Sequence, residues 1–198
     1  MSAPVLYLVV CGAGPADHVD RVVELAQAEG WDVWCVATPA AVEHFLDLDA
    51  LEALCGHPVR TGHQRTGQPA LPPAAAVVVA PATYNTINKW ASGIADTYVL
   101  TQLAELTGLG VPIAVLPFVN TALANNRAFH RSVAELRESG VTVLFGEGGF
   151  VPHPPRTGGQ AVEHYPWNAA LDAVRSARHS SSARPPAATP ARARTSRA

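Results

Sequence analysis

Five short apolar runs, separated by stretches with helical spacing, are the feature that most constrains the fold of this chain. The runs are PVLYLVVC (4–11), WDVWCVAT (31–38), AAAVVVA (74–80), VPIAVLP (111–117) and VTVLFG (141–146). Apolar residues at consecutive positions are typical of strands buried on both faces. Strands that alternate with helices form βαβ units with right-handed crossovers. We therefore predict a three-layer α/β fold with a parallel sheet of five or six strands.

The segments between the runs have the spacing of amphipathic helices. Val19, Val22 and Ala26 recur at three- and four-residue spacing before Gly30. Further helices are predicted at 40–55, 86–106, 121–138 and 165–178. The stretch at 56–73, GHPVRTGHQRTGQPALPP, is too rich in Gly, Pro and Arg for a regular element, so it predicts a long loop.

The length and the cysteines limit the class of protein. A chain of 198 residues suits one domain with its own buried core. Cys11, Cys35 and Cys55 are widely spaced and odd in number, so we expect no disulfide framework, no metal site and a reducing, cytoplasmic location. The N-terminus lacks basic residues before its apolar run, and no long uninterrupted apolar segment occurs, so we expect a soluble protein without a secretion signal or membrane span.

Charge is unevenly distributed along the chain. The formal net charge is −2, yet six arginines and no acidic residue lie beyond Asp172. Residues 179–198 are rich in Ser, Pro, Ala and Arg, so we predict a disordered basic tail behind a domain of residues 1–178. The tail could touch nucleic acid or another anionic surface. Scattered arginines are more often only solvated, so a nucleic-acid partner is not expected.

Small and hydroxyl residues follow the carboxyl ends of the predicted strands. These ends meet at one edge of a parallel sheet, where α/β proteins bind ligands. Helix N-termini there present backbone N–H groups and a positive dipole end, which bind phosphate without a basic side chain. A phosphorylated cofactor is therefore the expected ligand. The residues concerned include Gly12, Ala13, Gly14, Thr38, Pro39, Pro81, Ala82, Thr83, Asn85, Thr86 and Asn120.

Single members of this set also have a structural interpretation. Gly12-Ala13-Gly14 is a common strand-to-helix turn and, without a third glycine, a weak dinucleotide signal. Thr38 and Thr83 could each be a helix N-cap. One cap needs one side chain, whereas residues 85–88 supply several more polar groups, so a ligand explains the segment better than a turn.

Two blocks resemble the homo-oligomeric flavin-containing cysteine decarboxylases. That family includes phosphopantothenoylcysteine decarboxylase and enzymes that oxidatively decarboxylate a C-terminal cysteine of a peptide. Residues 81–100, PATYNTINKWASGIADTYVL, are similar to its Pro-Ala-Ser/Thr-Ala-Asn-Thr block and the following Gly-Ile-Ala-Asp. Residues 117–123, PFVNTAL, are similar to its Pro-x-Met-Asn-x-x-Met block, with Val119 and Leu123 in place of methionines. The resemblance extends roughly over residues 4–152.

The resemblance implies a flavodoxin-like (Rossmann-type) fold, FMN as cofactor, and trimers or assemblies of trimers with FMN near the subunit contact. Asn120 matches the family asparagine that binds the substrate carboxylate. Hydroxyls and amides suit a phosphate and ribityl chain, and apolar strand ends suit the flavin ring. The positions that match FMN-binding segments are Gly12, Ala13, Thr38, Ala82, Thr83, Asn85 and Thr86.

The family histidine has no counterpart in this chain. Its position, well before the Pro-Ala-Ser/Thr block, falls near Gly67 in GQPALPP. His63 is the candidate catalytic histidine, and His57 lies earlier still; either could reach a flavin only if the loop is remodelled, and an exposed loop histidine is the alternative. Tyr84 stands where the family has a small residue, so it could narrow the pocket or stack on the flavin.

The segment after the fifth strand departs from the family as well. Bacterial phosphopantothenoylcysteine decarboxylases carry a cysteine in a mobile loop there, whereas residues 146–159 read GEGGFVPHPPRTGG. No cysteine follows Cys55, which argues against the coenzyme A pathway step. The segment could be a lid that brings Phe150 or His153 over a flavin, or a slack connection.

These features favour an FMN-dependent oxidative decarboxylase of a cysteine-derived carboxylate, either a peptide C-terminal cysteine or a small cysteine conjugate. The missing histidine supports an alternative, an FMN-binding regulatory or redox protein of the same fold without decarboxylase activity. A prenyl-transferring flavoprotein fits less well, because that branch lacks the Pro-x-x-Asn block retained at 117–120.

Overall fold

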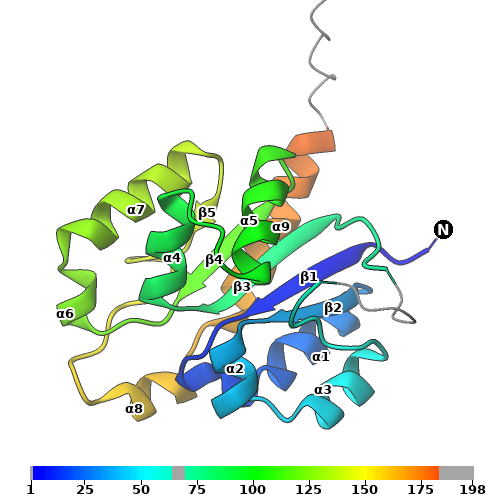
Figure 1. Cartoon of the computed structure of the whole chain (residues 1–198), viewed down its shortest axis with the longest axis horizontal. Helices are drawn as coiled ribbons and strands as arrows, with labels where there is room; N and C mark the ends of the chain where they lie inside the picture. The colour runs from blue at the N-terminus through cyan, green and yellow to red at the C-terminus, as the bar shows by residue number, and fades with distance from the viewer. Residues whose placement is uncertain (1, 64–69, 183–198) are drawn as a thin grey trace, which may run out of the picture.

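A parallel sheet of five strands forms the centre of the molecule (Figure 1). In this computed structural model, which describes residues 2–63 and 70–182, the strand order is β2-β1-β3-β4-β5, and every pairing is parallel. The predicted α/β fold is confirmed, with the strand order of flavodoxin-like proteins. The strands are β1 (Val5–Val10), β2 (Asp32–Ala37), β3 (Ala76–Ala82), β4 (Ile113–Pro117) and β5 (Thr142–Val143).

Helices cover both faces of the sheet. α1 (Asp20–Ala28) contacts β2, and α9 (Trp167–Ser182) contacts α1, β3 and β4. The opposite face carries α4 (Tyr84–Ala91), α5 (Tyr98–Gly108) and α7 (Arg127–Glu138), as Figure 1 shows. The shorter helices are the 3-10 helix η1 (Gly14–His18), α2 (Pro39–His44), α3 (Leu48–Cys55), α6 (Thr121–Ala124) and α8 (Gly158–Glu163). Within the described part of the chain, no helix is long and apolar enough to span a membrane.

Three of the predicted helices, at 40–55, 86–106 and 121–138, are each divided in two. The helix predicted at 40–55 divides into α2 and α3 because Asp47 caps α3, where its carboxylate accepts a hydrogen bond from the Ala50 N–H at 3.1 Å. The helix predicted at 86–106 divides at Gly93, whose φ of 70° is left-handed and ends α4. The break at Gly93 matters most, since it creates the N-terminus of α5, capped by Thr97, with its own free N–H groups.

Two more differences concern the helices predicted at 121–138 and 165–178. The helix predicted at 121–138 divides before Asn126, whose side chain accepts a hydrogen bond from the Ala128 N–H at 2.9 Å. The helix predicted at 165–178 begins at Trp167 and continues to Ser182, so the first residues of the predicted tail extend α9. The rest of that tail, 183–198, and the centre of the predicted loop, 64–69, lie outside the described residues.

The start of the 56–73 segment lies along the outer edge of β2. Val36 and Arg60 form a parallel bridge, in which the Arg60 N–H donates to the Cys35 carbonyl at 2.9 Å. The Ala37 N–H in turn donates to the Arg60 carbonyl at 2.8 Å. This contact covers an edge that would otherwise present unpaired backbone groups.

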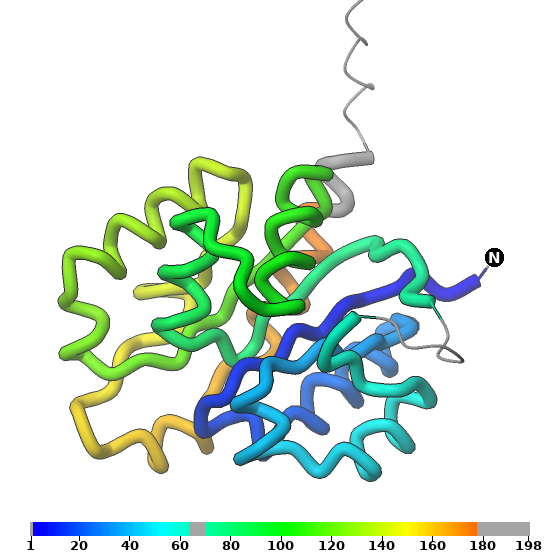
Figure 2. The backbone as a smooth tube through the Cα atoms, in the orientation of Figure 1, coloured from blue at the N-terminus to red at the C-terminus, as the bar shows by residue number. Residues whose placement is uncertain are grey.

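The chain after β5 returns along the carboxyl edge of the sheet. Figure 2 shows this segment, in yellow and gold, passing from β5 toward the blue turn that follows β1. α8 contacts η1, and an isolated bridge joins His153 to Asn120 after β4. The segment therefore brings the last part of the domain against residues that follow β1 and β4.

The centre of the sheet should dominate the stability of the fold. Leu8 of β1 is fully buried, so Leu8→Ala is expected to lower the free energy of unfolding by about 2–5 kcal/mol, through lost burial and the cavity left behind. Leu109→Ala is the matched control, because Leu109 is 70% exposed and its truncation should change stability by less than about 0.5 kcal/mol. Urea unfolding monitored by circular dichroism would measure both, and equal losses would contradict this assignment of the core.

Candidate functional site

A pocket lies at the carboxyl edge of the sheet, beside the ends of β1, β2 and β3. Its volume is about 340 Å³, within the usual range for small-molecule sites. The residues that line it are Gly12, Thr38, Pro39, Ala40, Thr83, Asn85, Thr86, Lys89, Thr97 and Leu100. Six of the residues predicted from the strand ends therefore meet in one cavity, namely Gly12, Thr38, Pro39, Thr83, Asn85 and Thr86.

Gly12 allows two elements of the pocket wall to approach closely. A Cβ at this position would lie 2.9 Å from both the carbonyl carbon and the Cβ of Ala40, in the first turn of α2. Contacts this short do not occur, so a side chain would push the turn after β1 away from α2. Glycine is required here by close approach of backbone rather than by an unusual backbone angle.

Thr38 and Thr83 are both helix N-caps, as one of the alternatives predicted. The Thr38 hydroxyl oxygen accepts hydrogen bonds from the Ala41 and Gly12 N–H groups, each at 3.3 Å, so it ties α2 to the turn after β1. Thr83 caps α4 by accepting from the Thr86 N–H at 3.2 Å, and the two hydroxyl oxygens lie 2.9 Å apart. The structural and the ligand-binding interpretations coexist, because both caps also line the pocket.

Three helix N-termini converge on this cavity. Thr97 caps α5 by accepting from the Leu100 N–H at 3.3 Å, and it lines the pocket with the caps of α2 and α4. The Nζ of Lys89 lies 2.5 Å from the carboxylate of Asp96, so its charge is already paired. The positive potential of the pocket therefore comes largely from helix ends, which is the arrangement that binds phosphate.

Cys11, next to Gly12, is buried and contacts Thr86 and the backbone of Thr83. Burial raises the pKa of the Cys11 thiol, and hydrogen bonds from Thr86 and the Thr83 backbone only partly offset this. The thiol therefore stays protonated near neutral pH. A neutral, buried thiol suits an apolar support beneath the pocket and not a nucleophile.

A second cavity, of about 390 Å³, lies between η1, α1 and α3. Its wall is largely apolar but includes Asp17, Asp20 and Asp47, and carboxylates repel phosphate. The cavity at the helix caps is thus the better phosphate site. Among residues 2–63 and 70–182, no three His, Cys, Asp or Glu side chains are grouped so that they could hold a metal ion.

The remaining predicted site residues lie outside the wall of the pocket. Ala82 ends β3 and is buried, and Ala13 precedes η1. Asn120 lies at the same sheet edge after β4, where it caps α6: its Oδ1 accepts a hydrogen bond from the Leu123 N–H at 3.0 Å. Asn120 is thus placed near the strand ends by β4 without touching the cavity of the capping threonines.

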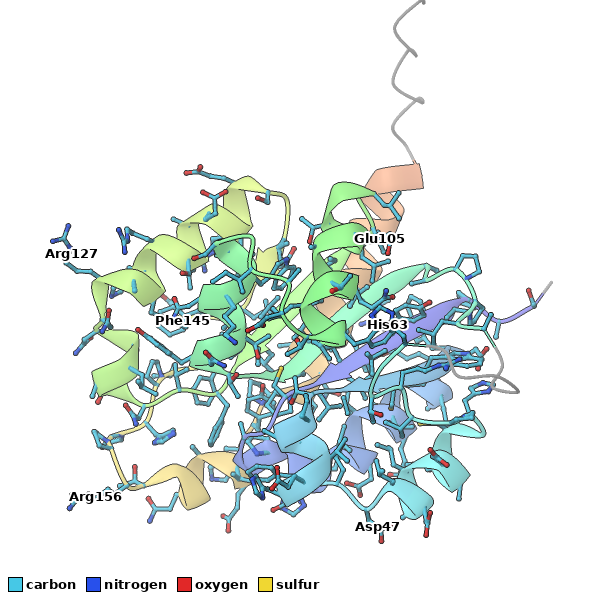
Figure 3. All side chains as sticks on the ribbon, in the orientation of Figure 1. Asp47, His63, Glu105, Arg127, Phe145 and Arg156 are labelled. Carbon is cyan, nitrogen blue, oxygen red and sulfur yellow. The ribbon has the colours of Figure 1, made fainter. Side chains whose placement is uncertain are left out.

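His63 lies on the side of the sheet that carries α5 (Figure 3). Its side chain is exposed, and its ring meets the ring of Tyr98 edge to face with centroids 5.2 Å apart. Tyr98 is the first residue of α5 and follows Thr97 of the pocket. His63 therefore contacts the residue that follows Thr97 of the pocket wall, but it does not itself line the pocket.

A comparison with protein families assigns the chain to one of them. A family model described as Flavoprotein matches residues 4–166, a range that includes every residue of the pocket and Asn120. The chain belongs to the flavoprotein family. The resemblance predicted from the two sequence blocks is confirmed.

Solved structures of several flavoenzymes are similar to this flavoprotein. The FMN-dependent cysteine decarboxylase SpaF is 26% identical, with 86% of this chain and 97% of SpaF covered and a TM-score of 0.62. The cypemycin decarboxylase CypD is 22% identical, with coverages of 89% and 94% and a TM-score of 0.66. The FMN binding protein AtHal3 is 22% identical, with coverages of 82% and 94% and a TM-score of 0.61. No curated protein sequence matches this flavoprotein.

Tyr84 does not narrow the pocket of this flavoprotein. Its ring stacks on Phe129 of α7, with centroids 5.8 Å apart and an angle of 16° between the planes, and it is not among the lining residues. The contact joins α4 to α7, the pair of helices that lie over β4 and β5. The tyrosine that replaces the small residue of the family is thus explained by its packing against Phe129.

An aromatic cluster of Phe118, Phe150, His153 and Tyr165 holds the segment that follows β5. Phe118 lies 5.3 Å from Phe150, 5.1 Å from His153 and 5.8 Å from Tyr165, measured between ring centroids. Burial raises the pKa of Tyr165 well above its usual range, so its hydroxyl stays protonated and donates to the Leu116 carbonyl at 2.5 Å. The segment is therefore packed onto the end of β4 and is not a slack connection.

The sequence analysis missed Ala40, Lys89, Thr97 and Leu100 of the pocket wall. Thr97 had a recognisable signal, because a threonine directly before the apolar sequence YVL is a typical N-cap. The continuous helix predicted at 86–106 concealed it. Lys89 and Leu100 carry no local signal, since their inclusion depends on how α4 and α5 pack against each other.

The two hydrogen bonds that the Thr38 hydroxyl accepts should contribute to stability, so removing the hydroxyl should lower the free energy of unfolding. Thr38→Ala removes the cap of α2 and its tie to Gly12, so the free energy of unfolding should fall by about 1 kcal/mol. Thr38→Ser keeps the hydroxyl and should stay close to wild type. Urea unfolding of the three proteins provides the measurement; if Thr38→Ser lost as much as Thr38→Ala, the methyl group and not the cap would matter.

Proposed function

We propose that this protein binds FMN in the pocket at the carboxyl edge of the sheet. The observation that carries the proposal is the convergence of three capped helix N-termini, at Thr38, Thr83 and Thr97, on one cavity. Helix N-termini bind phosphate well, and hydroxyl and amide side chains suit the ribityl chain. The residues proposed to hold FMN are Gly12, Ala13, Thr38, Ala82, Thr83, Asn85 and Thr86.

We further propose that the protein oxidatively decarboxylates a cysteine-derived carboxylate, at the C-terminus of a peptide or in a small cysteine conjugate. SpaF, described as an FMN-dependent cysteine decarboxylase, supports this by its similarity over 86% of the chain. Bound FMN would supply the two-electron oxidation. The chain would bind the carboxylate and keep water away from it, which favours loss of charge as carbon dioxide.

Asn120 is the proposed carboxylate-binding residue. Its Oδ1 accepts the Leu123 N–H, which fixes the orientation of the amide and turns the Nδ2 donors away from the start of α6. A carboxylate can accept hydrogen bonds from these donors. The position after β4 places this contact at the same edge as the proposed FMN pocket.

The absence of a histidine at the usual family position favours one other function. His63 stays the sequence-based candidate for proton transfer, yet its ring is exposed and lies against Tyr98. A protein that kept the FMN pocket without a suitably placed base would bind FMN as a regulatory or redox protein. That is the alternative which the activity measurement below decides.

Further parts of the proposal concern assembly, location and the tail. We propose trimers or assemblies of trimers, as the family resemblance implies. Three cysteines that are free and buried fit a reducing cytoplasm. The proposed FMN-binding domain is residues 1–178, and 179–198 is the proposed basic tail.

FMN binding can be tested through one buried hydroxyl. Thr86→Val keeps the shape of the side chain but removes a hydroxyl of the pocket wall, which lies against the hydroxyl of Thr83. Losing one hydrogen-bonding group of the proposed FMN site should weaken FMN binding about tenfold. Thr142→Val is the control, since Thr142 is an exposed residue of β5 away from the pocket. Quenching of flavin fluorescence measures both dissociation constants. A wild-type protein that takes up no added FMN would refute the proposed cofactor.

Decarboxylation can be tested with the FMN-loaded protein and peptides that end in cysteine. Mass spectrometry should show loss of carbon dioxide and two hydrogens. Asn120→Ala should lower kcat/KM by about 10- to 100-fold, the effect of losing a hydrogen bond to a charged group. Asn125→Ala, at an exposed asparagine of the same turn, is the control and should leave kcat/KM unchanged. A protein that binds FMN but leaves cysteine peptides and conjugates intact would support the regulatory or redox alternative.

A further inference from the structure

His153 lies directly beside Asn120 at the end of β4. The two residues form a parallel bridge, and the Thr121 N–H donates to the His153 carbonyl at 2.8 Å. Paired residues on neighbouring strands lie about 4.8 Å apart. The carboxylate and the thiol of one cysteine are separated by only two carbon atoms. A single cysteine could therefore contact both side chains.

The ring of His153 is held in place by its neighbours. Its centroid lies 5.1 Å from that of Phe118 and 6.3 Å from that of Phe150. Phe150 is buried, and Tyr165 anchors the same cluster through its hydrogen bond to the end of β4. An imidazole fixed in this way loses little rotational freedom when a ligand arrives.

One contact decides which ring nitrogen carries the proton. Nδ1 of His153 lies 2.8 Å from the carbonyl oxygen of Pro154. A carbonyl oxygen can only accept, so Nδ1 must be the donor. In the neutral imidazole the lone pair then lies on Nε2, which is the nitrogen able to take up a proton.

Gly158 leaves room at the Nε2 edge of the ring. A Cβ placed on Gly158 would lie 3.4 Å from Cε1 and 3.6 Å from Nε2 of His153. These are ordinary contact distances, so alanine would fit there without displacing the ring. It would, however, cover the edge that a substrate would need to reach.

From these contacts we propose that His153 accepts the thiol proton of a cysteine whose carboxylate is bound by Asn120. In this step the S–H bond breaks, the proton binds to Nε2, and the bonding electron pair stays on sulfur as a thiolate. This role rests on the proposed function and differs from the assignment of His63, whose ring is exposed against Tyr98. The basic group missing from the usual family position is then supplied by the segment after β5.

Turnover of FMN-loaded variants tests the proposal first. His153→Phe keeps the ring contacts but has no nitrogen, and it should lose about 10²- to 10⁴-fold in kcat/KM. Gly158→Ala keeps the histidine but covers its Nε2 edge and should also lose activity. His130→Phe, at an exposed histidine of α7, is the control and should be unaffected. Full activity of His153→Phe, or a loss confined to His63→Phe, would overturn the role of His153 and leave the proposed function standing.

Histidine NMR of the FMN-free protein tests the proton transfer without turnover. Two-bond proton–nitrogen spectra should show His153 protonated on Nδ1, with the signals assigned by their absence in His153→Phe. A peptide ending in cysteine should convert His153 to the doubly protonated form, whereas the same peptide ending in serine should not. A proton on Nε2, or equal spectra with both peptides, would refute the inference. If wild-type protein binds FMN but never decarboxylates, the proposed function fails while these spectra still decide the role of His153.

Discussion

Parallel pairing of strands that are buried on both faces is the constraint on which the rest of the structure depends. All seven residues of β3 are buried, so its backbone groups must pair with β1 and β4 and its side chains must be covered by helices on both faces. Each crossover helix then begins at the carboxyl edge. The free N–H groups of these helices collect at that edge as a consequence of the topology.

The pocket uses these groups in place of exposed basic side chains. Thr38, Thr83 and Thr97 satisfy one N–H group of their helices each, and all three caps line the cavity, so the positive ends of three helices lie beside it. Lys89 is the basic residue of the wall, and its ion pair with Asp96 limits its contribution. Partial charges of this kind are fixed by the backbone, so they need no rearrangement when a phosphate binds.

Aromatic packing gives the carboxyl edge a second group of functional side chains. Phe118 belongs to the turn after β4, while Phe150, His153 and Tyr165 belong to the segment after β5. These ring contacts and the bridge between Asn120 and His153 hold the segment after β5 against the carboxyl ends of the strands. The proposed carboxylate-binding asparagine and the proposed proton acceptor thus come from parts of the chain that are joined by packing and not by sequence.

The sequence by itself determined the fold class, the strands and most of the pocket wall, because these depend on local patterns: apolar runs for strands, and small or hydroxyl residues directly after them. Gly12, Thr38 and Thr83 could be predicted for that reason. The divided helices could not, since the breaks at Asp47 and Gly93 interrupt patterns that are otherwise continuous. Only the tertiary structure decided which histidine lies beside Asn120. His63 and His153 are both loop histidines in the sequence, and the difference between them arises from long-range ring packing and a backbone bridge that no local pattern encodes.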